Sequence, residues 1–239
     1  MTYDVAIESL EERIPARWKI VPFRRLATLV DVANANSSAP LLSLASTGII
    51  APREEFDGLG RQMPAESTIE RYWLAKPGNL VVNPMWLVGG GIGVSEVFGA
   101  VSPDYRVYRL GPDLYPRYVH HLLRSQPYRD QYKLYTRAET TFDRRVSKID
   151  FHAMPLLVPP LDEQRRIADF LDAETAQIDG LATARHQART LLLERRAARV
   201  FGLITGADTA DRAPSQLAWA TSLPAAWRSV KLRDSSKSA

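Results

Sequence analysis

Short apolar runs, separated by glycine, proline and asparagine, fill the chain from about Arg13 to Pro155. The runs APLLSLAS, NLVVNPMWLV and DYRVYRL have the length and the flanking residues of β-strands. The stretch PRYVHHLLRSQPY instead predicts a helix that starts at Pro116 and stops before Pro127, because proline suits a first helical turn and disfavours helix just before it. The pattern predicts an α+β domain of about 140 residues with a twisted mixed sheet.

A helical period begins after Pro159 and Pro160. Asp162 and Glu163 follow, at the end of a helix where the dipole favours acidic groups. From Ile167 a three-four spacing defines a stripe of nine positions, of which six are apolar: Ile167, Leu171, Ile178, Leu181, Ala188 and Leu192. About 40 helical residues span ~60 Å, more than the width of a domain this small. The stripe is therefore expected to pair with another helix as a coiled coil.

A repeat links the two ends of the chain. The segments IPARWKIVPFRR, residues 14–25, and LPAAWRSVKLRD, residues 223–234, share five identities in twelve positions, including Pro15 with Pro224 and Trp18 with Trp227. The chain is thus interpreted as one complete unit followed by the start of a second. The predicted divisions are an N-terminal arm (1–12), a globular domain (13–156), a long helix (157–206), a linker (207–222) and a truncated second domain (223–239).

Composition excludes several classes of protein for this chain. The 239 residues are 45% hydrophobic and include no cysteine, which predicts a globular protein of a reducing cytoplasm without disulfides or thiolate metal sites. The acidic start MTYDVAIESLEERIP does not resemble a signal peptide, and the longest apolar run is too short and too rich in glycine and proline to span a membrane. The formal net charge of +4 permits nucleic acid as a partner without requiring it.

Motifs for catalysis are weak. NPMW, residues 83–86, is similar to the Asn/Asp-Pro-Pro-aromatic motif with which adenine methyltransferases hold a flipped base, but its second proline is replaced by Met85. The glycines of VGGGIGV, residues 88–94, follow that motif and do not open a βαβ unit, so a buried strand ending in a glycine-rich turn is the favoured interpretation. The four histidines are scattered, which favours structural roles over a metal site.

A basic stretch is the best candidate for binding. Residues 117–148 contain eight basic side chains against three acids, with tyrosines interleaved, and basic groups supply phosphate contacts. The alternative is a solvated helix face with core tyrosines. A second, weaker candidate is the acid-containing loop 51–62 with Arg53 and Arg61. The predicted DNA-binding residues are Lys133, Arg137, Thr140, Thr141, Arg144, Arg145 and Lys148.

Four stretches together resemble the DNA-specificity subunit of type I restriction–modification systems. They are PARWKIVPFRRLA, KPGNLVVNPMW with GAVSPDYRVYRL, PPLDEQRRIADFLDAETAQIDGL, and LLLERRAARVFGLITG, of which the PPLDEQ segment is the most specific. In that family a target-recognition domain and a spacer helix occur twice, the two helices pair antiparallel, and each domain reads half of an interrupted site in double-stranded DNA. This chain departs from the plan, since it has one domain, one helix and a stub of about 17 residues.

The resemblance implies a DNA-recognition protein without catalysis of its own. Methyltransferase subunits that use S-adenosylmethionine and a motor-nuclease subunit that uses ATP and Mg²⁺ would be its partners, and this chain would hold no cofactor or metal. A homodimer, or pairing with another specificity chain, would restore the two-domain layout. The open alternatives are a fragment of an adenine methyltransferase that uses NPMW, an inactive truncated subunit, and a coiled-coil scaffold without a DNA role.

Overall fold

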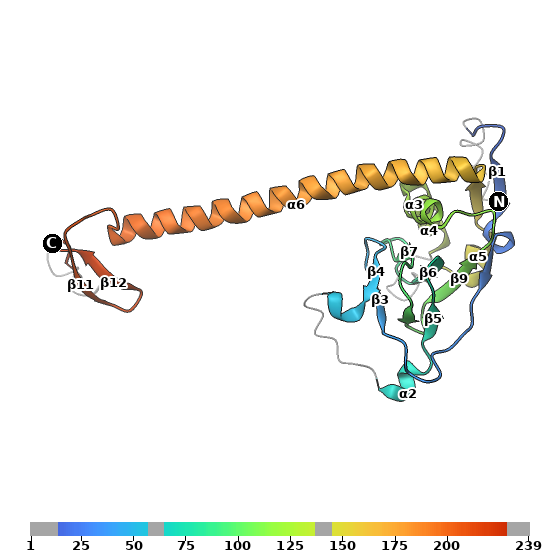
Figure 1. Cartoon of the computed structure of the whole chain (residues 1–239), viewed down its shortest axis with the longest axis horizontal. Coiled ribbons are helices and arrows are strands. Elements are labelled where there is room, and N and C mark those ends of the chain that lie inside the picture. The colour runs from blue at the N-terminus through green and yellow to red at the C-terminus, as the bar shows by residue number, and fades with distance from the viewer. Residues whose placement is uncertain (1–13, 57–64, 137–144, 229–239) are drawn as a thin grey trace. The chain divides into compact units, whose positions relative to one another are not determined.

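The computed structural model describes residues 14–56, 65–136 and 145–228. The chain divides into two compact units, residues 1–173 and residues 174–239. The first unit contains helices and several small sheets, which confirms the predicted α+β class (Figure 1). Its paired strands run antiparallel, and the parallel component is a single bridge between Leu41 and Ala100.

The central sheet has the strand order β2-β9-β6-β7. Its strand β6 is buried on both faces, which explains why LVV is a continuous apolar run and not an alternating one. Leu80 and Val82 pack in the larger core with the helices, whereas Val81 packs in a second core with the outer strands. The strands of this sheet are β2 (Ala27–Leu29), β6 (Asn79–Val82), β7 (Ile92–Val94) and β9 (Arg106–Leu110).

Smaller elements surround that sheet. Two antiparallel pairs, β3 with β4 and β5 with β8, close the second core. Their bounds, with those of the short helices nearby, are β3 (Leu42–Leu44), β4 (Ile50–Pro52), η2 (Arg53–Glu55), α2 (Glu66–Ile69), β5 (Trp73–Ala75) and β8 (Gly99–Val101).

Helices cover the larger core. The predicted helix at Pro116 is confirmed as α3 (Pro116–Arg124), and α4 (Gln126–Tyr135) follows after one residue. Tyr118, Tyr128 and Tyr132 are buried between them and the sheet, and each hydroxyl donates to a backbone carbonyl. These aromatic residues stabilise the core, so for them the alternative of core tyrosines is correct and a contact with DNA sugars or bases is not.

At one edge of the first unit, a strand from its beginning pairs with a strand from its end. Strand β1 (Lys19–Pro22) pairs antiparallel with β10 (Pro155–Val158), which directly precedes the long helix. Phe23 packs against Phe151 and Tyr108. Phe23 belongs to the 3₁₀ turn η1 (Phe23–Arg25), which follows β1, and Phe151 belongs to helix α5 (Lys148–Ala153), which precedes β10. The predicted long helix is confirmed as α6 (Leu161–Thr205), beginning after the two prolines.

The second unit contains the C-terminal part of α6 and a hairpin. Gly206 ends the helix with a φ of 60°, and the N–H of Ala207 donates to the carbonyl of Gly202, as in a Schellman cap. The segment predicted as a linker, 207–222, instead contains β11 (Arg212–Leu217) and the start of β12 (Ala220–Pro224). Local sequence signals do not predict this hairpin, because side-chain contacts hold it in place: the Arg212 guanidinium donates to the carbonyls of Thr205, Gly206 and Ser222.

The repeat has a structural counterpart. The N–H of Trp18 donates to the carbonyl of Pro15 at 2.8 Å, and the N–H of Trp227 donates to the carbonyl of Pro224 at 2.9 Å. The same Pro-x-x-Trp turn therefore occurs in both units. In the described ranges, no helix has the length and apolar character that a membrane crossing needs.

Candidate nucleic-acid interface

The structure describes three of the seven predicted DNA-binding residues. Lys133 is exposed on α4 and pairs with Asp130 at 2.7 Å. Arg145 is exposed and pairs with Asp104 at 3.3 Å, and Lys148 is exposed at the first position of α5. Four predicted residues lie outside the described residues: Arg137, Thr140, Thr141 and Arg144.

Several basic residues of the same stretch have structural partners instead. Arg124 donates to the carbonyls of Gly90 and Ile92 at 2.8 and 3.1 Å, and Arg129 donates twice to the carbonyl of Val88. These two guanidinium groups hold the glycine-rich turn that follows β6. A charge count over 117–148 therefore overstates the surface that is free to bind DNA.

Four cations from separate segments form what we call the cationic patch: Arg24, Arg106, Arg145 and Lys148. Burial, and then the positive charges of Lys148, Arg106 and Arg24, lower the pKa of His152, so the three cations lie near one imidazole. Burial likewise lowers the pKa of Arg106, and the like charge of Arg145 lowers it further. The patch thus gathers positive charge from η1, β9, α5 and the segment before α5.

Carboxylates offset little of this charge. Among the described residues, no acidic side chain forms a salt bridge with Arg24, Arg106 or Lys148, and only Asp104 pairs with Arg145. Arg106 donates from Nη2 to the carbonyl of Val146 at 3.1 Å, a neutral partner. A group of four cations with a single paired carboxylate on a folded scaffold is suited to the phosphates of a nucleic acid.

Sequence reasoning found half of this patch. It named Arg145 and Lys148, and it missed Arg24 and Arg106 because each lies in a segment of ordinary local charge. One available signal was the repeat, in which Arg24 and Arg233 are identical. The weaker candidate loop 51–62 is described only to residue 56. In it Arg53 is half-buried at the first position of η2, and the exposed Glu54 and Glu55 follow.

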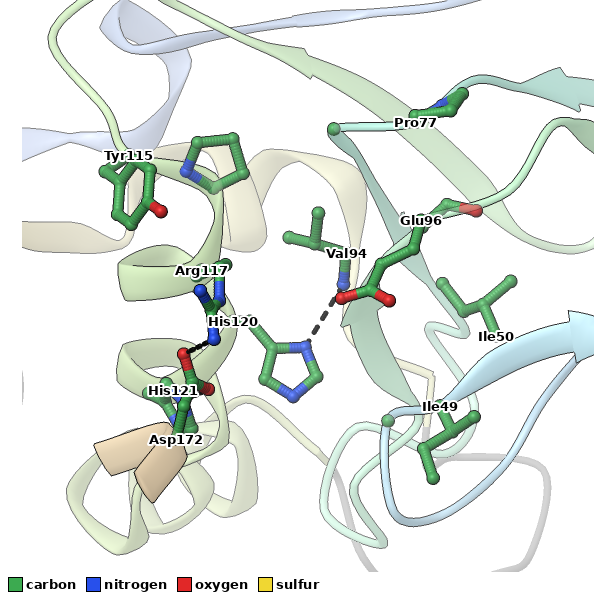
Figure 2. A pocket seen from close by; sticks show the side chains of 14 residues that line it. Ile49, Ile50, Pro77, Val94, Glu96, Tyr115, Arg117, His120, His121 and Asp172 are labelled. Atoms are coloured by element: carbon green, nitrogen blue, oxygen red, sulfur yellow. Dashed lines mark hydrogen bonds and ion pairs between the residues drawn. The ribbon is translucent and has the colours of Figure 1, made fainter. Parts of the chain in front are cut away.

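A cavity of about 560 Å³ in the first unit is lined by residues that include Val94, His120 and Asp172 (Figure 2). His120 points into it from α3, and its Nδ1 accepts the N–H of Val94 at 3.3 Å. The neighbouring His121 instead contacts Asp172 of α6 at 2.7 Å, where Arg117 also pairs. Both histidines thus have structural partners. Within the described ranges, no cluster of three His, Cys, Asp or Glu side chains could hold a metal ion.

His120 gives the fold a dependence on pH. Burial, helped by Arg124 and His121, lowers its pKa from 6.5 to about 4. The unfolded chain therefore binds more protons than the folded chain between these values, and the free energy of unfolding is expected to fall as pH decreases from 6.5 to 4. Urea unfolding at several pH values should show a flatter dependence for His120→Gln. His186→Gln, at an exposed position of α6, is the matched control and should retain the wild-type slope.

Comparisons with known proteins give matches at the level of structure. No family model and no curated protein matches the sequence. A solved chain described under complex assembly and conformational transition of the type I restriction–modification system superposes with a TM-score of 0.52 and 17% identity, over 84% of this chain and 51% of that one. The fold is therefore similar to that of a chain from a type I restriction–modification system. A crystal structure of the HsdS subunit from Thermoanaerobacter tengcongensis matches with a TM-score of 0.46 and 17% identity, over 72% of this chain and 40% of that one. The chain thus spans about half the length of these two.

The PPLDEQ segment attaches the long helix α6 to the rest of the first unit. Gln164 is fully buried, accepts the N–H of Tyr115 at 2.8 Å, and donates to the carbonyls of Asp113 and Pro159, each at 2.8 Å. Glu163 forms an ion pair with Arg17 at 2.9 Å. Gln164 thus joins the start of α6 to the segment that precedes it and to the segment before α3, a positioning role that sequence analysis did not predict.

The predicted helix-pairing residues of α6 fall into two groups. Ile167 packs against the core of the first unit, and Leu171 is half-buried. Ile178, Leu181, Ala188 and Leu192 are exposed on α6 in the second unit, where pairing with another helix stays a prediction. The exposed apolar side chains continue to the end of the helix, at Leu191, Leu193, Val200, Phe201, Leu203 and Ile204.

Proposed function

We propose that this chain recognises one half of a bipartite site in duplex DNA, as the specificity subunit of a type I restriction–modification complex. It performs no catalysis. Methyltransferase subunits, which carry S-adenosylmethionine, dock on it, and a restriction subunit that uses ATP and Mg²⁺ joins the complex. The fold supports this function at the level of architecture.

The cationic patch is the observation that carries the proposal. A first unit with a specificity-subunit fold gathers Arg24, Arg106 and Lys148 near the imidazole of His152 and Arg145 near Arg106, with little compensation by acids. Phosphate contacts supply most of the non-specific affinity of DNA-binding proteins, and they position the protein for base contacts. The patch is where we expect the backbone of the half-site to lie.

A second copy of the chain, or another specificity chain, completes the binding unit. The exposed apolar side chains of α6 supply the surface for the mate, and the repeated Pro-x-x-Trp turn supports an architecture built from two such units. A homodimer with two-fold symmetry would recognise an interrupted palindrome. Co-expression with methyltransferase subunits, followed by mapping of methylated adenines, would identify the site.

Charge reversal tests the DNA interface. The double variant Arg145→Glu/Lys148→Glu is expected to bind random duplex DNA at least ~10-fold more weakly, and the slope of log K against log salt should become shallower by about two, because two phosphate contacts are lost. Fluorescence anisotropy at several salt concentrations measures both quantities.

Arg71 provides the matched control, because it is exposed in the first unit and lies outside the cationic patch. Arg71→Glu should leave the salt slope unchanged. Equal affinities of the wild type and the double variant, with unchanged circular dichroism, would remove the patch from the interface. Measurable binding of S-adenosylmethionine by the isolated chain would favour a methyltransferase fragment instead.

A further inference from the structure

The NPMW segment, which sequence analysis interpreted as the end of a buried strand before a glycine-rich turn and not as a methyltransferase motif, forms a turn fixed by hydrogen bonds. The side chain of Asn83 accepts the N–H of Met85 at 3.1 Å, and the N–H of Trp86 donates to the carbonyl of Asn83 at 3.0 Å. The N–H of Gly91 donates to the carbonyl of Trp86, while the N–H of Asn83 donates to the carbonyl of Gly91, each at 2.8 Å. The turn is therefore fixed at both of its ends.

This rigid turn displays large apolar side chains. Trp86 is 49% exposed and Met85 is 40% exposed, although the neighbouring Pro84 and Leu87 are buried. The indole ring is seated on a glycine: a Cβ at Gly89 would lie 2.3 Å from Nε1 of Trp86. Only glycine leaves room for the ring in this position. The backbone thus holds a half-exposed tryptophan in a defined pose, which requires an explanation beyond core packing.

The surroundings of the turn are cationic. The N–H of Val146, next to Arg145, donates to the carbonyl of Pro84 at 3.0 Å, and Arg106 donates to the carbonyl of Val146. On the other side Arg129 donates to the carbonyl of Val88. Because these two guanidinium groups contact neutral carbonyls, they fix the turn without losing their positive charge to a carboxylate.

We propose that Trp86, with Met85 beside it, makes an apolar contact with the sugars and base edges in a groove of the bound half-site, next to the phosphates held by the cationic patch. The proposal rests on the proposed function and deepens it. Arg106 and Arg145 belong to the patch, and the hydrogen bonds of Val146 connect them to the turn. An apolar side chain within a cationic surface suits a partner that is negatively charged outside and apolar inside. Duplex DNA has this character, with phosphates outside and stacked bases inside, and a protein surface generally does not.

The chemistry of this contact differs from that of the patch. Packing of an indole against bases or sugars releases no counterions, so it contributes affinity that does not depend on salt. It can also distinguish sequences, because thymine methyl groups and deformable base steps favour apolar contacts. Trp86 is therefore expected to influence which sequence is bound, whereas the cations mainly influence how tightly any duplex is bound.

Three variants of the full chain test the proposal. Trp86→Ala is expected to weaken binding of random duplex DNA roughly tenfold with the salt slope unchanged, and Trp86→Phe should retain part of the affinity. Gly89→Ala should resemble Trp86→Ala, because the added methyl group displaces the ring without removing it. Trp219→Ala, at a comparably exposed tryptophan in the second unit, should bind as the wild type does. Circular dichroism confirms that each variant is folded.

Photocrosslinking supplies a direct measurement. A random-sequence duplex that carries 5-iodouracil in place of thymine should crosslink at residues 85–86 of the wild type, as mapped by mass spectrometry. Wild-type binding with neither this crosslink nor an effect of Trp86→Ala would overturn the proposal while leaving the proposed function intact. If the wild type binds no duplex at all, the proposed function itself fails. Loss of methyltransferase binding by Trp86→Ala at full DNA affinity would assign the turn to a protein partner, which also overturns the proposal.

Discussion

Replacing Gln164 with alanine is expected to lower the free energy of unfolding by about 3 kcal/mol, because three backbone groups lose their hydrogen bonds to a fully buried side chain, at about 1 kcal/mol or more each. Those groups are the N–H of Tyr115 and the carbonyls of Asp113 and Pro159. For a unit of this size the midpoint of thermal unfolding should fall by about 6–12 °C. Urea and thermal unfolding, monitored by circular dichroism, measure the two quantities.

The isosteric variant Gln164→Glu separates shape from hydrogen bonding. It fills the same volume, but it replaces the amide donor with a carboxylate that faces the carbonyl oxygens of Asp113 and Pro159. We expect it to be at least as unstable as Gln164→Ala at neutral pH, since the buried carboxylate would keep one donor, the N–H of Tyr115, but would face two carbonyl oxygens. Arg166→Ala, at an exposed position two residues along α6, serves as the control. Wild-type stability of both Gln164 variants would mean that the helix start does not depend on this residue.

Local sequence signals predicted the elements whose formation is decided locally. The helix that begins after Pro159 and Pro160 and ends at Gly206 was predicted with nearly correct bounds, since proline and glycine act through backbone geometry. The predicted α+β domain and its fold relationship followed from the spacing of apolar runs and from the PPLDEQ segment.

The roles of the arginines could not be predicted in the same way. Arg124 and Arg145 lie in one basic stretch, yet the first holds backbone carbonyls and the second is exposed in the cationic patch. Arg24 and Arg106 join that patch from segments more than 80 residues apart. Which guanidinium contacts the chain itself is decided by tertiary packing, and no local count of charge contains that information.

The apolar stripe of α6 also contains residues in two different environments, which tertiary packing decides. A three-four spacing selects Ile167 and Ile178 equally, but the first packs in the core of its own unit and the second is exposed. Periodicity identifies a face of a helix and not the partner of that face. The residues to be tested for pairing are consequently those from Ile178 onward.

Placing two acidic side chains on this exposed stripe, as Ile178→Glu/Leu181→Glu, is expected to convert a dimer into a monomer. Both side chains are 61% exposed in the single chain, so the variant should keep its own fold. In a pair of helices, however, each apolar side chain buried against the mate contributes roughly 1.5 kcal/mol or more. Because each mutation occurs twice in a dimer, the dimer is expected to lose at least ~6 kcal/mol of association free energy. This loss corresponds to a ~10⁴-fold increase in the dissociation constant.

Light scattering at micromolar concentration measures the oligomeric state, and Ala176→Glu/Thr183→Glu is the matched control, because these positions lie on the opposite face of α6 and add the same charge. The control should remain dimeric. A wild-type chain that is monomeric would contradict pairing with a second copy and would favour another specificity chain as the mate. A monomeric variant that binds a single half-site but no longer prefers two half-sites on one duplex would show that pairing serves to connect two recognition domains, since linked sites gain affinity only while the linkage persists.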